Sequence, residues 1–229
     1  DISGPHGRVA PTLKKYPEIL FEDGKFDFNH STNTYVQAGC TVTASSENNG
    51  TTSGFAYLAF DGVANGTRGY HGVGTYSSGV YQGDEKITGS GSIEYDGEWI
   101  KLELPHKIKV TGVSFAPRVE TSAGQLYSNR IPYKGYILGS NTGSDGSWEL
   151  INSFDNVTTS EGVTKRIDFT GTNEYYKHIA MVAEEVGPNA TYGDVLNFSE
   201  LEYYGTEEYT PTGDHSVDTT FMSRFNNPQ

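Results

Sequence analysis

Acidic, histidine and cysteine side chains are all present in this 229-residue chain, but not in the spacings that catalysis requires. The sequence contains no G-x-S-x-G nucleophile motif, no H-E-x-x-H zinc motif and no phosphate-binding P-loop. Its one cysteine, Cys40, excludes a disulfide framework and a cysteine-rich zinc site, and we expect it to be a buried thiol. The 29 Asp and Glu residues leave a paired-acid glycosidase open as an alternative.

Asparagine sequons are more frequent than chance predicts. Fourteen Asn residues in a chain rich in Ser and Thr should give about two or three Asn-x-Ser/Thr triplets, and the sequence has six. One of them, Asn197, is in a predicted strand, where we expect no glycan. We predict glycosylation at the other five, which are Asn29, Asn49, Asn65, Asn156 and Asn189. The sequons therefore indicate a secreted protein, or one of a cell or virion surface.

The charge balance narrows the classes of partner. With 16 Lys and Arg residues and a formal net charge of -13, the chain lacks the basic clusters that bind a phosphate backbone. The same excess of acid disfavours docking on an anionic membrane. No stretch approaches the roughly 20 apolar residues that cross a bilayer. We therefore expect neither nucleic acid binding nor membrane insertion.

The elements that must position these side chains are short strands. From Tyr35 onward, strand-like runs alternate with turns at intervals of about ten residues. In GEWIKLELP (97–105), Ile100, Leu102 and Leu104 alternate with charged or amphipathic residues, as expected of a strand with one apolar face. No helix longer than one or two turns is predicted. The pattern is typical of an all-β antiparallel β-sandwich or jelly roll.

Eight motifs follow one another along the chain, from AFDG at 59–62 to FSELEYYG at 198–205. This ordered set resembles the discoidin domains, which are the coagulation-factor C-type or galactose-binding-like family. Within that family the motifs are most similar to those of the fucose-binding lectins. The resemblance covers residues 32–206 and implies an eight-stranded antiparallel β-sandwich with binding loops at one end. We expect 1–31 to be an extended N-terminal arm and 207–229 to be a linker or the start of a following module. The motifs are AFDG (59–62), YHG (70–72), GEWIKLELP (97–105), VSFAPR (113–118), NRIPYKGYILGSN (129–141), DGSW (145–148), YYKHIAM (175–181) and FSELEYYG (198–205).

The resemblance implies a calcium ion, because calcium-binding members of the family clamp an ion between an A-F-D-G loop and the last strand. Calcium takes six to eight oxygen ligands, which carboxylates and backbone carbonyls can supply together. The alternatives are a turn-forming role for Asp61 and an outward-facing strand position for Glu200. The positions that match the family's ligands are Leu58, Asp61, Val63, Thr75, Ser199 and Glu200.

The resemblance also implies a sugar site. Fucose-binding members use two arginines and a histidine, and these match Arg118 and Arg130, whereas the histidine position falls near Tyr76. Guanidinium donors beside an aromatic ring suit a saccharide. Surface ion pairs are the alternative role of each arginine, with Glu120 in the case of Arg118. The aromatic or imidazole side chains predicted in the same loops are Tyr70, His71, Tyr76, Tyr127 and Tyr192.

Together, these features predict a non-catalytic, calcium-supported carbohydrate-binding or adhesion module of a larger extracellular glycoprotein. Its expected partners are glycans or glycoproteins, together with neighbouring domains of the same parent chain. The alternative is a glycosylated structural subunit of a surface filament, a cell coat or a viral fibre, in which the fold serves packing.

Overall fold

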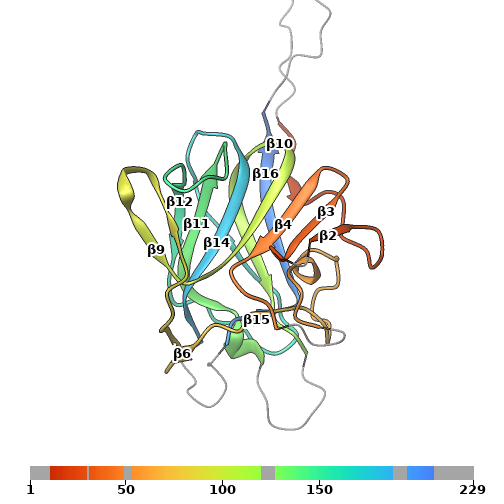
Figure 1. The fold of residues 1–229 in the computed structure, drawn as a ribbon, viewed down its shortest axis with the longest axis vertical. Helices are drawn as coiled ribbons and strands as arrows, with labels where there is room; N and C mark the ends of the chain where they lie inside the picture. Colours follow the sequence, from red (N-terminus) through yellow and green to blue (C-terminus); the bar gives the residue numbers. More distant parts are fainter. Residues whose placement is uncertain (1–10, 30, 49–52, 120–126, 188–194, 209–229) are drawn as a thin grey trace, which may run out of the picture.

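The computed structural model describes residues 11–29, 31–48, 53–119, 127–187 and 195–208. Antiparallel strands dominate these residues, and the helical elements among them are short 3-10 turns (Figure 1). The elements are β1 (Lys14–Tyr16), β2 (Asp27–Asn29), β3 (Thr34–Gln37), β4 (Cys40–Ala44), η1 (Ala56–Ala59), β5 (Tyr70–His71), β6 (Tyr76–Ser77), β7 (Val80–Tyr81), β8 (Lys86–Thr88), η2 (Ser90–Ser92), β9 (Glu94–Asp96), β10 (Glu98–Ala116), η3 (Tyr127–Arg130), β11 (Pro132–Ser140), β12 (Glu149–Phe154), β13 (Lys165–Asp168), β14 (Tyr176–Val186), β15 (Asn197–Phe198) and β16 (Glu200–Glu207). The predicted all-β antiparallel class is confirmed.

The 19-residue strand β10 joins the two layers of the sandwich. Its first part pairs with β4 and β14 in the layer ordered β12-β11-β14-β10-β4-β3-β2. Its second part pairs with β16 and β13 in the other layer. The pairing with β14 changes register between Glu103 and Ile108, where Pro105, His106 and Lys107 are exposed. Pro105 has no backbone N–H to donate to the ladder, which suits it to this bend.

Aromatic side chains fill much of the space between the layers. Tyr35, Tyr70, Phe115, Phe198 and Tyr203 are all fully buried there. Each large ring removes 150–250 Å² of surface from water, so a chain with few aliphatic residues can still bury a sizeable core. The predicted burial of Cys40, at 2% exposure, is confirmed. A smaller cluster around Trp148 lies on the outer face of the first layer, under the β8–β9 hairpin.

The N-terminal segment differs from the expected extended arm. Strand β1 pairs with the last strand, β16, and Tyr16 is buried. Phe21 is buried as well, and its backbone N–H donates to the carbonyl of Phe60 at 2.9 Å. Strand β2 pairs with β3. Residues 14–29 are therefore part of the sandwich, because two aromatic side chains and a backbone ladder hold them to it.

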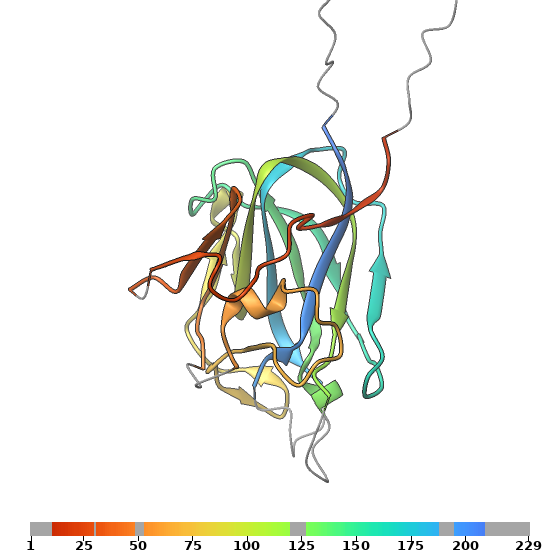
Figure 2. The ribbon, with the colours of Figure 1, turned by 90° about the vertical axis from the view of Figure 1, so that its right-hand side faces the viewer.

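The two ends of the sandwich are different in kind. The first and last described residues, near 11 and 208, leave it at one end (Figure 2). The opposite end, which we call the loop end, carries η3, β5, β6 and β15 (Figures 1 and 2). Within the described residues, no helix is long and apolar enough to cross a membrane.

Candidate functional site

Two arginines meet one tyrosine ring at the loop end. Arg118 follows β10, while Tyr127 and Arg130 belong to η3. The guanidinium carbon of Arg118 is 5.2 Å from the centroid of the Tyr127 ring, and that of Arg130 is 4.9 Å from it. The two guanidinium carbons are therefore no more than about 10 Å apart, inside the separation of about 15 Å beyond which the arginines could not serve one monosaccharide. Three of the predicted sugar-site residues are thus brought together.

Arg118 also contacts the backbone of a neighbouring loop. Its Nε donates to the carbonyl of Thr67 at 2.9 Å, and its Nη2 donates to the same oxygen. One residue later, the N–H of Val119 donates to the carbonyl of Gly66 at 3.0 Å. The expected partner Glu120 lies outside the described residues. Arg118 therefore holds a loop in place in addition to contacting Tyr127.

Two predicted sugar-site tyrosines are in the core instead. Tyr76 is 5% exposed, and its hydroxyl donates to the carbonyl of Ala183 at 3.0 Å. Tyr70 is fully buried, with its hydroxyl on the carbonyl of Ser46. Both side chains point inward from strand positions, so neither presents a ring face to a sugar.

The last two residues predicted for the sugar site are His71 and Tyr192. His71 is half-buried in β5, opposite Asn197 of β15, and its carbonyl accepts the N–H of Asn48 at 2.8 Å. The region of His71 was predicted to be a loop, and in the structure it is part of the short antiparallel pairing of β5 with β15. Tyr192 lies outside the described residues.

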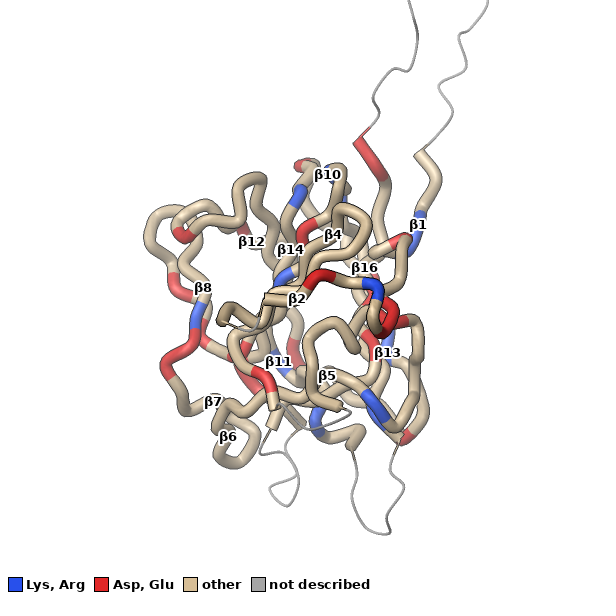
Figure 3. Tube along the Cα trace, turned by 45° about the vertical axis from the view of Figure 1, so that its right-hand side comes forward, with Lys and Arg blue, Asp and Glu red and all other residues tan. Residues whose placement is uncertain are grey.

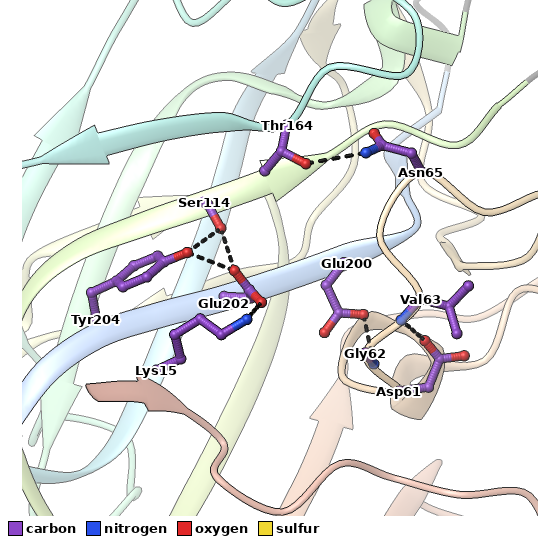
Figure 4. Close-up of polar contacts among 10 residues, drawn as sticks. All are labelled: Lys15, Asp61, Gly62, Val63, Asn65, Ser114, Thr164, Glu200, Glu202 and Tyr204. Carbon is purple, nitrogen blue, oxygen red and sulfur yellow. Dashed lines mark hydrogen bonds and ion pairs between the residues drawn. The ribbon is translucent and has the colours of Figure 1, made fainter.

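Asp61 and Glu200, which we call the acid pair, lie side by side beneath the loop that follows η1 (Figure 4). The N–H of Gly62 donates to Oε2 of Glu200 at 3.0 Å, and the N–H of Val63 donates to Oδ1 of Asp61 at 2.9 Å. Glu200 has the outward orientation of Glu202 on β16, yet it is only 2% exposed because the loop covers it. The structure thus brings together the two carboxylates predicted to hold calcium.

The electrostatics of the acid pair disfavour two ionised carboxylates side by side. Burial, together with the nearby Asp61, raises the pKa of Glu200 to about 9. Burial also raises the pKa of Asp61. The nearest cation with an effect on Asp61 is Arg68, which is in an ion pair with Asp23 at 3.1 Å. A bound cation would relieve this repulsion, as expected where two like charges share a buried site.

The donor types around the acid pair fit a hard cation. Two carboxylates and a tight glycine-containing turn are a source of oxygen ligands. Ser199 is buried, and its hydroxyl accepts the N–H of Asn65 at 2.8 Å, so its carbonyl rather than its side chain is the available ligand. Thr75 lies next to the Glu98 site rather than the acid pair, because the N–H of the preceding Gly74 donates to Glu98 at 2.8 Å.

Among the described residues, one cluster combines three side chains with metal-ligating atoms, and it lies at the opposite end of the sandwich. It consists of Glu18, His106 and Glu207. The ammonium group of Lys14 already lies between the two carboxylates, at 2.9 and 2.6 Å. An ion at the acid pair would consequently depend on backbone carbonyls for most of its ligands.

The sequons have unequal surroundings. Asn29 and Asn156 are exposed, and Asn156 has a left-handed φ of 59° in a turn. Asn65 donates its side-chain amide to Thr164 at 3.3 Å, so its amide contacts the protein. Asn197 is fully buried in β15, as expected of a strand position that carries no glycan. Asn49 and Asn189 lie outside the described residues.

Sequence reasoning missed a buried carboxylate close to the loop end. Glu98 is fully buried and accepts the hydroxyl of Ser46 and the N–H of Gly74. The signal was in the sequence, because Glu98 has the same parity as Ile100 and Leu102 and must face the core with them.

Comparison with known proteins supports the fold. No protein-family model and no curated protein matches the chain. Among solved structures, an F5/8 type C domain from Bacteroides fragilis has a TM-score of 0.51 at 12% identity, over 81% of this chain and 99% of that one. A carbohydrate-binding module from Clostridium perfringens, in complex with GalNAc-β-1,3-galactose, has a TM-score of 0.48 at 22% identity, over 72% and 94%. The family 32 module of Clostridium perfringens NanJ, in complex with galactose, has a TM-score of 0.46 at 20% identity, over 73% and 94%. At these identities the likeness shows a discoidin-like β-sandwich and no more.

Proposed function

We propose that this chain is a non-catalytic carbohydrate-binding module of a larger extracellular protein, with its sugar site at the loop end. The observation that carries the proposal is the convergence of Arg118 and Arg130 on the ring of Tyr127. The three residues come from two chain segments, and the fold brings them to the end of the sandwich away from the described chain ends.

The chemistry of this convergence suits a saccharide. A guanidinium presents N–H donors in a fixed plane, which can reach two neighbouring hydroxyl oxygens of a sugar ring. An aromatic ring beside these donors can pack against the C–H face of the same sugar. A shallow site with few contacts binds weakly, because each ordered side chain has an entropic cost. Repeated modules in a parent chain would raise the effective affinity.

Calcium is the second part of the proposal. Asp61 and Glu200 would hold the ion, together with backbone carbonyls of the loop and of Ser199. When bound, calcium supplies the positive charge that the acid pair lacks. Its role would be structural, because it would tie the loop after η1 to the start of β16.

A glycan array followed by calorimetry tests the sugar site. The first probes are galactose and GalNAc-β-1,3-galactose, the sugars bound by two of the similar structures. Arg130→Ala should weaken binding by about 1.5–3 kcal/mol, the range for hydrogen bonds to charged groups. Its melting temperature should stay nearly unchanged, since Arg130 is only half-buried, at the last position of η3.

The chain offers a matched control. Arg166 also lies over a tyrosine ring, with its guanidinium carbon 3.7 Å from the centroid of Tyr204, but it belongs to β13. Arg166→Ala should leave sugar binding intact. Equal losses in both variants would show that Arg130 has no specific role. A wild-type protein that binds no glycan, but forms ordered self-assemblies, would favour the structural-subunit alternative.

The extracellular setting has its own test. Material from the native source should carry glycans at Asn156, which is exposed, and at the predicted Asn49 and Asn189. Asn197 should be bare, because its side chain is fully buried. Mass spectrometry of glycopeptides measures both. A fully occupied Asn197 would contradict its placement in β15.

A further inference from the structure

The loop of residues 61–69, which we call the Asp61 loop, is hydrogen-bonded to the start of β16 on one side. Gly62 donates its N–H to Glu200, and Asn65 donates its N–H to the hydroxyl of Ser199 (Figure 4). The same hydroxyl shares its proton between the carbonyl of Ala116, the last residue of β10, and that of Pro117. The position of this loop is therefore tied to the acid pair and to the strand that carries Glu200.

The other side of the Asp61 loop is held by the segment that follows β10. The carbonyl of Gly66 accepts the N–H of Val119, and the carbonyl of Thr67 accepts two N–H groups of the Arg118 guanidinium. Charge-assisted hydrogen bonds of this kind are stronger than neutral ones. Arg118 thus fixes the carbonyl that lies six positions after Asp61.

Arg118 also reaches the proposed sugar site, with its guanidinium carbon 5.2 Å from the centroid of the Tyr127 ring. The same ring lies 4.9 Å from the guanidinium carbon of Arg130. One side chain therefore contacts the Asp61 loop and η3 at once. Arg118 thus has a positioning contact in addition to the sugar contact expected from the sequence.

We propose that Arg118 is a positioning residue that couples cation binding at the acid pair to the order of η3. The inference builds on the calcium and sugar sites proposed above. It assigns regulation to them: a divalent cation prepares the Tyr127–Arg130 turn for its ligand, and by linkage a bound ligand strengthens the hold on the cation.

The contacts make this transmission physically direct. A cation drawn to both carboxylates pulls the Asp61 loop toward β16. The loop has little slack, because a side chain at Gly69 would come within 2.3 Å of the carbonyl oxygen of Phe198. A shift at Asp61 therefore reaches Thr67, and the guanidinium bonded to Thr67 carries it to the Tyr127 ring. Closely packed elements transmit small displacements in this way.

Residue-resolved hydrogen exchange on the full chain, with calcium alone as the probe, tests the coupling. In the wild type, saturating calcium should slow amide exchange about tenfold, within the usual range of coupling, both in the Asp61 loop and in η3. In Arg118→Gln, calcium should still slow exchange in the Asp61 loop but should leave η3 unchanged. Arg166→Gln, which removes the other arginine over a tyrosine, should behave as the wild type does.

Each outcome decides something different. Slower exchange in the Asp61 loop alone, in the wild type, overturns the coupling and leaves the calcium site standing. No calcium effect in either segment removes the calcium site and the coupling with it, while the sugar site keeps its separate test on the glycan array. If Arg118→Gln does not fold, Arg118→Lys serves in its place, since it keeps the charge but cannot donate two parallel N–H groups. Full calcium protection of η3 in a folded Arg118 variant contradicts the proposal.

Discussion

Two sites in this protein bury carboxyl groups, and the groups that surround the carboxyls differ between the two sites. Glu98 is fully buried and accepts a hydroxyl donor from Ser46 and an N–H donor from Gly74. Gly72 and Gly74 leave room for it, since a side-chain carbon at Gly72 would lie 2.2 Å from its Oε1. Glu98 thus uses neutral donors and a glycine-lined space to fasten a loop to β10.

The acid pair has a different composition. Asp61 and Glu200 place two like charges together, and each accepts one N–H from the Asp61 loop. Among the described residues, neutral donors reach only Oε1 of Glu98, and burial raises the pKa of this carboxyl as well, whereas two adjacent carboxylates need a proton or a cation. The difference separates a structural anchor from a proposed cation site. Figure 3 marks the acidic and basic residues along the described chain, in a sequence whose 29 Asp and Glu residues outnumber its 16 Lys and Arg residues.

The largest effect expected from this comparison is at the anchor. Glu98→Ala leaves the Ser46 hydroxyl and the Gly74 N–H without their acceptor, and it opens a cavity. Stability should fall by about 4 kcal/mol, because each stranded buried donor costs about 1–3 kcal/mol. Urea denaturation measures the loss. The control is Glu94→Ala, which removes a carboxylate from an exposed ion pair with Lys86 and should change stability by less than about 1 kcal/mol. If Glu98→Ala loses as little stability as this control, Glu98 does not anchor the loop.

Glu47 is a third buried carboxyl, and its effect on stability should depend on pH. It is 7% exposed, accepts the hydroxyl of Tyr35 and the N–H of Ala56, and burial raises its pKa to about 7. Native Glu47 keeps its proton to higher pH than the unfolded chain does, so the free energy of unfolding falls as pH rises from about 4.5 to 7. This contribution should be about 3 kcal/mol.

Glu47→Gln isolates that contribution, since glutamine keeps the acceptor oxygen without the charge. The difference in the free energy of unfolding between the variant and the wild type should grow as pH rises from 4.5 to 7. Urea denaturation at several pH values measures it. A difference that is constant over this window would contradict the raised pKa.

A smaller effect, of opposite sign to that at Glu98, is expected at the acid pair. Without calcium, native Glu200, with its pKa of about 9, must take up a proton at pH 7 that the unfolded chain does not hold, and Glu200→Gln removes that cost while keeping an acceptor for the N–H of Gly62. Stability in EDTA at pH 7 should rise by about 1 kcal/mol. Thermal melts measure the gain. A destabilised variant in EDTA would show that Glu200 is an anchor of the same kind as Glu98.

The sequence predicted the strands better than the side-chain surroundings. Alternation of apolar residues in GEWIKLELP correctly predicted a strand, because one buried face requires period two. The same alternation assigns Glu98 to the core face, but a charged residue is not expected there, so sequence reasoning missed it. The family resemblance assigns Tyr76 to the sugar site because the histidine position falls near it, whereas its strand position turns its ring inward. The contact of Arg118 with Thr67 could not be predicted, since it joins two loops that only the fold brings together.

The central claim, that the acid pair is a cation site, is most directly tested by thermal melts in calcium and in EDTA. Calcium that binds only the native state should stabilise the wild type by about 2.7 kcal/mol at a hundredfold excess over its dissociation constant. EDTA should reverse the shift, and Asp61→Ala should abolish it while Glu98→Gln retains it. Identical melting curves of the wild type in calcium and in EDTA would contradict the claim.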